Sequence, residues 1–111
     1  MLYSEALTVS MVTTHIGYSA VPQHLSVGRI KDVIVLTHEA MQRMLGRPPR
    51  LAICGLNPHA GEHGLFGTRE EERWIEPARV EAAELLQHGG HQSSTRGLVG
   101  QVGAKGLRID A

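Results

Sequence analysis

Aromatic side chains, cysteine and surplus charge are all scarce in this 111-residue chain. Aromatic residues make up 4% of the sequence, so any core must be built mainly from aliphatic side chains. The single cysteine, Cys54, excludes an intrachain disulfide and a cysteine-rich zinc module, and its apolar neighbours predict a buried, inert thiol. Eleven basic and eleven acidic residues balance, which excludes a broad charge field for nucleic acid or an anionic membrane.

Long hydrophobic runs are also missing from the sequence. No apolar stretch approaches the roughly 20 residues that a membrane helix needs, and the N-terminus lacks the pattern of a secretory signal. We therefore expect a cytoplasmic protein with neither nucleic acid nor membrane as a partner. Histidine, by contrast, is abundant, and seven histidines in so short a chain favour metal binding or proton transfer.

Two apolar segments predict β-strands, and the segment between them predicts a helix. Residues 6–13 alternate between two faces, and residues 50–55 form a second short apolar run. Between them, Ser26 is a suitable N-cap, apolar residues recur at helical spacing over about 27–45, and Gly46 supplies a left-handed end. The order strand, helix, strand predicts an α/β fold with a β-α-β core of parallel strands.

The later part of the chain predicts less structure. Thr68 is a candidate cap for a polar helical turn, whose acidic residues 70–72 we interpret as a solvated helix start. Residues 1–87 are predicted to form a partial α/β domain that ends with a second helix-prone segment. Residues 88–111 are rich in glycine and have no clear period, so we expect a disordered tail there.

Histidines follow both predicted strands. His15 ends the first strand, and a glycine-containing loop with His59, Glu62 and His63 follows the second. Ligands of open α/β sheets bind beyond the carboxyl ends of the strands, so His15 and His59 are candidate metal or substrate ligands. The alternative is that both are loop histidines bonded to backbone. Glu62 either orients a ligand histidine or remains a solvated carboxylate, and His63 is expected to face solvent.

Several sequence strings closely resemble the central part of the 4-hydroxythreonine-4-phosphate dehydrogenase family, whose relatives act on threonate-4-phosphate-like acids. The resemblance covers about residues 6–78 and implies a fragment of a two-domain α/β/α, Rossmann-like dehydrogenase. The strings that carry it are Thr13-Thr14-His15, Gly55-Leu56-Asn57-Pro58-His59-Ala60-Gly61-Glu62 and Gly64-Leu65-Phe66-Gly67.

The resemblance also implies a chemistry and a site. The family oxidises and decarboxylates a phosphorylated hydroxy acid with NAD or NADP and a divalent metal, which we expect to be zinc, magnesium or cobalt. His15 and His59 match two of its three metal-ligating histidines, and Thr14, Asn57 and Glu62 are placed to orient them. The family forms a homodimer with the metal at the interface. No catalytic or cofactor-binding residue is assigned.

Other parts of the family pattern have no match here. The third metal histidine, the upstream phosphate-binding pair and the downstream substrate- and nicotinamide-binding segments are missing from the sequence. We therefore expect a truncated fragment without turnover of its own, with residues 88–111 as a non-family tail produced by a frameshift. The alternative is a non-catalytic α/β module that binds a metal or a partner.

Overall fold

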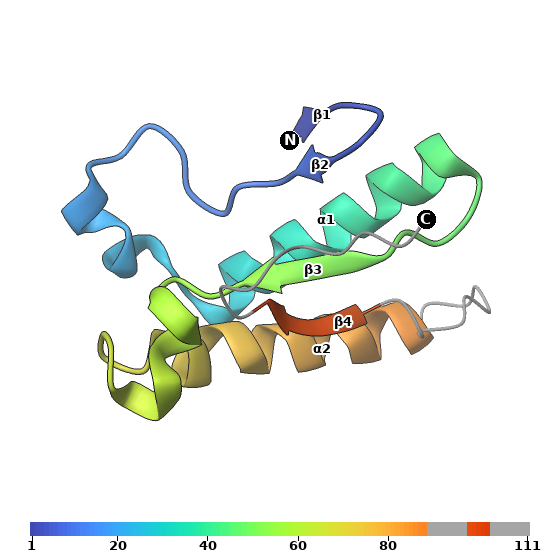
Figure 1. The fold of residues 1–111 in the computed structure, drawn as a ribbon. Coiled ribbons are helices and arrows are strands. Elements are labelled where there is room, and N and C mark those ends of the chain that lie inside the picture. The colour runs from blue at the N-terminus through green and yellow to red at the C-terminus, as the bar shows by residue number, and fades with distance from the viewer. Residues whose placement is uncertain (89–97, 103–111) are drawn as a thin grey trace.

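The computed structural model describes residues 1–88 and the backbone of residues 98–102 (Figure 1). Most of the tail predicted at 88–111 therefore lies outside the described residues. No helix within the described part of the chain is long and apolar enough to cross a membrane. The elements in chain order are β1 (Leu2–Tyr3), β2 (Thr8–Val9), η1 (Tyr18–Ala20), η2 (Pro22–His24), α1 (Val27–Leu45), β3 (Leu51–Cys54), η3 (Pro58–Gly64), η4 (Glu71–Ile75), α2 (Glu76–His88) and β4 (Leu98–Val102).

Helix α1 begins and ends where its sequence predicts. The Ser26 hydroxyl oxygen accepts a hydrogen bond from the Arg29 backbone N–H at 3.1 Å, which satisfies one of the unpaired donors of the first turn. Gly46 adopts the left-handed conformation at φ 67°, and its N–H donates to the Gln42 carbonyl at 2.9 Å. These local signals confirm the predicted helix.

The strand pairing differs from the prediction. Residues 6–13 and 50–55 are not paired with each other in the described part of the chain. Strand β2 is two residues long and pairs antiparallel with β1, whereas β3 pairs in parallel with β4. The β-α-β unit of this structure is thus β3, α2 and β4, and it uses a strand from the segment predicted to be disordered.

Helix α1 explains why the first strand is so short. The Val12 carbonyl, which would face a neighbouring strand in a sheet, accepts a hydrogen bond from Arg29 Nε at 3.2 Å. The Thr37 hydroxyl donates to the Val33 carbonyl, so it accepts from the Ser10 hydroxyl, whose oxygen lies 2.8 Å away. Residues 10–12 are therefore bonded to the helix. The structure is a small α/β fold with a short sheet, and it does not confirm a Rossmann-like β-α-β arrangement.

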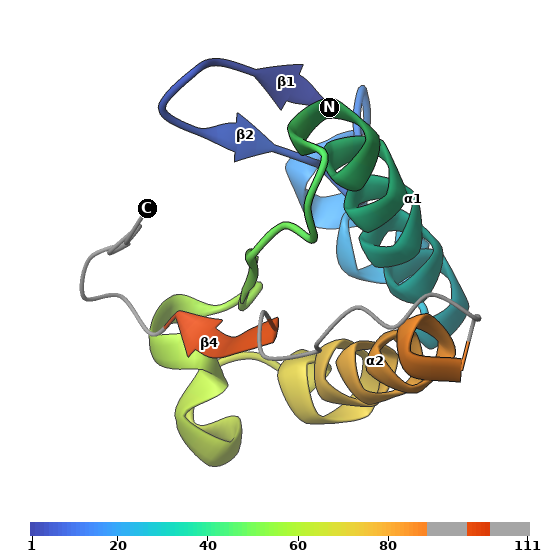
Figure 2. The ribbon, with the colours of Figure 1, turned by 90° about the vertical axis from the view of Figure 1, so that its right-hand side faces the viewer.

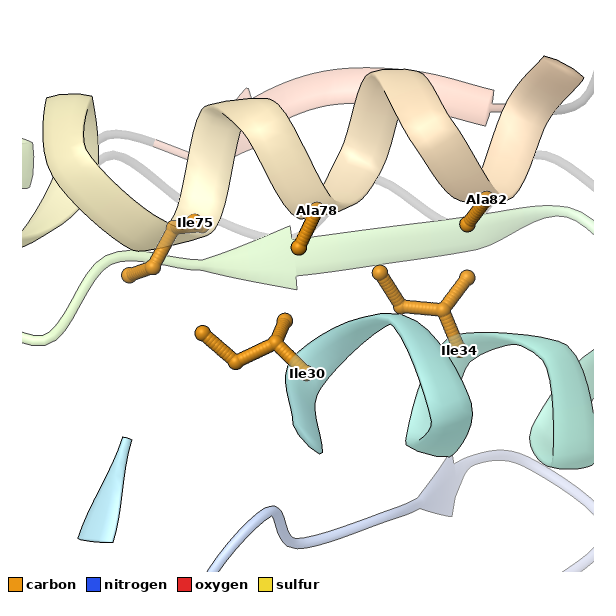
Figure 3. Packing of buried hydrophobic residues seen from close by; sticks show 5 residues of the cluster. All are labelled: Ile30, Ile34, Ile75, Ala78 and Ala82. Atoms are coloured by element: carbon orange, nitrogen blue, oxygen red, sulfur yellow. The ribbon is translucent and has the colours of Figure 1, made fainter. Parts of the chain in front are cut away.

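Helices α1 and α2 lie on the same side of the β3–β4 pair, as Figure 2 shows. The core forms between the two helices and the strands beside them (Figure 3). Ala78 and Ala82 of α2 are fully buried, so the two helices approach closely at these positions. Lys31 Nζ lies 3.3 Å from Glu81 Oε2 and links the exposed edges of α1 and α2. The buried cluster consists of Ile30, Ile34, Ile75, Ala78 and Ala82.

The apolar stripe of α1 is only partly buried. Ile30, Ile34 and Met41 are buried as expected, but Met44 and Leu45 are exposed, because α2 and the strands do not cover them. Helical spacing of apolar residues predicts that the whole stripe is buried, and this is wrong for Met44 and Leu45.

Strand β3 has one covered face and one open face. Leu51 and Ile53 pack against the core cluster, whereas Ala52 and Cys54 are exposed. Successive strand residues point to opposite sides, and both helices lie on one side of β3. The prediction of a buried Cys54 is wrong for this reason.

Pro77 lies in the first turn of α2, a position in which proline is tolerated. The π-helical segment η4 leads directly into α2, and the Glu76 N–H donates to the Glu71 carbonyl five residues earlier. Proline has no N–H and crowds the carbonyl of the preceding turn. The wider π turn accommodates the ring in a continuous helix.

Candidate functional site

The loop that follows β3 folds into a left-handed turn. Five consecutive residues have positive φ: His59 (53°), Ala60 (54°), Gly61 (79°), Glu62 (39°) and His63 (56°). Each non-glycine residue in this conformation costs about 1–2 kcal/mol. Strain of this kind persists only where the surroundings hold it, and it clusters at functional sites.

Backbone hydrogen bonds close the turn. The Phe66 N–H donates to the Gly61 carbonyl at 3.1 Å, and the Leu65 N–H donates to the Glu62 carbonyl at 3.2 Å. The turn is therefore a compact unit that projects from the end of β3.

The imidazoles of the turn face outward. His59 is exposed, its Nδ1 lies 3.9 Å from Glu62 Oε1, and its ring centroid lies 6.3 Å from that of Phe66. The distance to Glu62 exceeds a hydrogen bond but allows attraction to a protonated imidazole. The His63 side chain is fully exposed, which confirms that it faces solvent.

His15 occupies a comparable backbone state, with φ 57°, in the exposed segment between β2 and η1. Figure 1 shows η1, η2 and η3 at the same end of the fold, the end at which β3 finishes. No group of three or more histidine, cysteine or acidic side chains in the described part of the chain is arranged to hold a metal. Catalytic zinc sites use three protein ligands, so these residues alone do not complete one.

Two carboxylates beside the turn are buried, which the sequence did not lead us to expect. Glu70 is 5% exposed and Glu71 is 2% exposed, so the interpretation of a solvated helix start is wrong for both. Glu70 Oε1 accepts from the Thr68 hydroxyl at 2.7 Å, and Oε2 accepts from the Thr68 N–H at 2.7 Å. Thr68 thus bonds to Glu70 and does not cap the helix. The short spacing of Thr68 and Glu70 could have indicated this contact, because threonine side chains readily form hydrogen bonds with nearby residues.

Asn57 connects both carboxylates to the turn. Its backbone N–H donates to Glu71 Oε1 at 2.7 Å. Its side-chain Nδ2 lies 2.9 Å from Glu70 Oε2 and 3.3 and 3.2 Å from the two oxygens of Glu71. Gly67, at φ 75°, leaves room for this cluster, because a Cβ there would collide with Asn57 and Glu70. Two buried carboxylates therefore share one amide.

The Glu70 cluster makes the stability of the fold depend on pH. The hydrogen bond from the Thr68 hydroxyl, helped by backbone and Asn57 donors and opposed by burial, lowers the pKa of Glu70 from 4.5 to about 2. A carboxyl whose folded pKa is depressed stabilises the fold above its unfolded pKa, and this contribution is lost as pH falls through the folded pKa. We expect Glu70→Gln to flatten the fall in the urea unfolding midpoint between about pH 4.5 and pH 2.

Glu72→Gln is the control, because Glu72 is an exposed carboxylate two residues from Glu70, and its ion pair with Arg69, at 3.2 Å, lies at the surface. It is expected to leave the acid dependence of the midpoint close to that of the parent chain. A Glu70→Gln chain with the parent's acid dependence would contradict the lowered pKa.

The sequence is similar to those of two named enzymes. The chain is 51% identical over 84 residues to a 4-hydroxythreonine-4-phosphate dehydrogenase of Desulfosudis oleivorans, with 75% of the chain and 24% of the relative covered. It is 46% identical over 82 residues to a D-threonate 4-phosphate dehydrogenase of Cupriavidus necator, with 74% and 24% covered.

A solved structure shows the same likeness in three dimensions. The crystal structure of a 4-hydroxythreonine-4-phosphate dehydrogenase from Burkholderia phymatum matches with a TM-score of 0.55 and 38% identity. The match covers 75% of this chain and 24% of that one. The chain thus spans about a quarter of the length of the relatives that it matches.

The two relatives and the solved structure are all named dehydrogenases. A family model described as the pyridoxal phosphate biosynthetic protein PdxA matches residues 1–95. The chain belongs to the PdxA family, which confirms the resemblance predicted from its histidine-containing strings.

Proposed function

We propose that this chain is part of an NAD- or NADP-dependent dehydrogenase that oxidises and decarboxylates a phosphorylated hydroxy acid. The names of the relatives support 4-hydroxythreonine 4-phosphate or D-threonate 4-phosphate as the substrate class. The observation that carries the proposal is the turn after β3, where a specific family string becomes a strained loop with an outward imidazole. We keep the homodimer and the cytoplasmic location as predictions.

A divalent metal is the second part of the proposal, with His15 and His59 as ligands and zinc, magnesium or cobalt as candidates. A bound metal would polarise substrate oxygens as a Lewis acid. Glu62 Oε1 lies 3.9 Å from Nδ1 of His59, so the carboxylate stands beside the proposed ligand without a hydrogen bond to it. Further ligands must come from a second copy or from residues outside the described part of the chain.

Calorimetric titration of the chain with Zn²⁺, Mg²⁺ and Co²⁺ tests the metal site. We expect uptake of at least one ion, and His15→Ala/His59→Ala should weaken it by at least about tenfold, the loss typical of even an outer partner of a metal ligand. Equal uptake by the parent and the double variant, or none by either, would contradict the proposal.

His24→Ala/His88→Ala is the matched control. Both histidines are exposed, and their Nδ1 atoms lie 2.9 and 2.7 Å from backbone carbonyls four residues earlier. The control removes the same number of imidazoles and leaves both site strings unchanged. It is expected to keep the parent's metal affinity.

A non-catalytic role in partner binding is the second candidate, and the open face of β3 favours it. Ala52 and Cys54 are exposed on that face, where apolar strand residues are usually covered. Spectrophotometric detection of NADH or NADPH formation with 4-hydroxythreonine 4-phosphate separates the two candidates. Turnover would support the dehydrogenase and exclude the binding module. Metal uptake without turnover would exclude an active dehydrogenase in this chain alone, and is expected both of a truncated fragment and of the binding module.

A further inference from the structure

The buried carboxylates lie directly beneath the histidine turn. A Cβ at Gly61 would stand 2.7 Å from Glu71 Oε2, and a Cβ at Gly55 would stand 3.2 Å from Glu71 Oε1. The carboxylate therefore occupies the space between the end of β3 and the middle of the turn. Glycine at both positions allows the backbone to approach it closely.

The same carboxylate fixes the residue at which the turn begins. Asn57 donates both its backbone N–H and its side-chain amide to Glu71, and the amide also reaches Glu70. The backbone bond is 2.7 Å long, at the short end of the range for N–H···O hydrogen bonds. Pro58 follows immediately, and its ring restricts the preceding Asn57 to extended backbone, at φ −97° and ψ 159°, so the direction of the turn is set at Asn57.

We propose that Glu71, assisted by Glu70, is a positioning residue that holds Asn57 and thereby orients the left-handed turn and the His59 imidazole. The second half of this inference, the effect on metal binding at His59, rests on the proposed function. Glu71 is the first residue of η4, and its side chain accepts the hydrogen bond from Asn57. One side chain therefore connects the helical segment to the loop.

Glu71→Gln tests the positioning role with little change in size. The substitution replaces one acceptor oxygen of Glu71 with an NH₂ group, which donates. At least one hydrogen bond from Asn57 is therefore lost. We expect the Asn57 amide to exchange its proton at least about tenfold faster, because the turn opens more often. The ring resonances of His59 should shift as well. Both readouts come from NMR of the metal-free chain.

Zinc affinity is the readout that a purely structural role would not change. Calorimetric titration of Glu71→Gln with Zn²⁺ should show a loss of about 10–100-fold, as found when partners of metal ligands are removed. Glu72→Gln, which changes the neighbouring exposed carboxylate, is expected to keep the parent's exchange rate, resonances and zinc affinity. Asn57→Ala keeps the backbone donor to Glu71 and serves as the milder variant where Glu71→Gln does not fold.

The outcomes separate this inference from the proposed function. Unchanged exchange at Asn57 and unchanged His59 resonances in a folded Glu71→Gln chain would overturn the positioning role. Faster exchange with full zinc affinity would also overturn it, while the metal site would stand. A parent chain that takes up none of Zn²⁺, Mg²⁺ and Co²⁺ would refute the metal site alone, and the NMR readouts would still decide whether Glu71 positions the turn.

Discussion

Replacing Gly61 with alanine is expected to destabilise the chain by about 2–5 kcal/mol, the largest effect we predict for a loop residue. At φ 79° the added Cβ carries a left-handed penalty of about 1–2 kcal/mol. The Cβ would also stand 2.7 Å from Glu71 Oε2, so a buried carboxylate must move, and overpacking of this kind costs about 1–3 kcal/mol. Urea unfolding measures the difference.

Gly46→Ala separates the two contributions. Gly46 has a similar φ of 67°, but nothing lies within 4 Å of a Cβ built there. Its replacement is therefore expected to cost only the backbone penalty of about 1–2 kcal/mol. Equal losses of stability in the two variants would show that the turn does not rest on Glu71.

Replacing Ile30 with alanine is expected to lower the free energy of unfolding by about 2–5 kcal/mol. Ile30 is buried in the cluster between α1 and α2, where the fully buried alanines Ala78 and Ala82 leave little side-chain volume to fill a cavity (Figure 3). Domains are stable by only about 5–15 kcal/mol, so the variant should lose a large share of its folded population. Thermal and urea unfolding followed by circular dichroism measure the loss.

Two variants define the scale of this effect. Ile30→Val removes a single methylene and should cost about 0.5–1.5 kcal/mol. Leu36→Ala changes an exposed residue of the same helix and should stay within about 0.5 kcal/mol of the parent. A loss at Leu36 as large as that at Ile30 would mean that the core does not lie where the structure has it.

Helix α1 could be predicted from sequence because its signals are local. Ser26, the apolar spacing and Gly46 each specify a conformation within one or two turns of themselves. Strand pairing depends on contacts between distant segments. The alternation of side chains along one strand does not show which segment it pairs with. Residues 10–12 show the consequence, since their partners proved to be Arg29 and Thr37 of the helix.

The candidate site was predictable in part for the same reason. The string around His59 identified the family and the loop, but nothing in it indicated five successive left-handed residues. An acidic run at a helix start normally faces water, and Glu72 follows that rule. Glu70 and Glu71 depart from it because the donors of Thr68 and Asn57 compensate their burial, and that arrangement exists only after folding.

The open face of β3 has a practical consequence for every measurement of self-association. Cys54 is the only cysteine of the chain, and its thiol is exposed beside the histidine turn. Exposed thiols oxidise to disulfides between molecules, so a covalent pair can form in air and resemble a specific dimer. The same thiol accepts a maleimide fluorophore at a single position, which makes the end of β3 directly observable without any substitution.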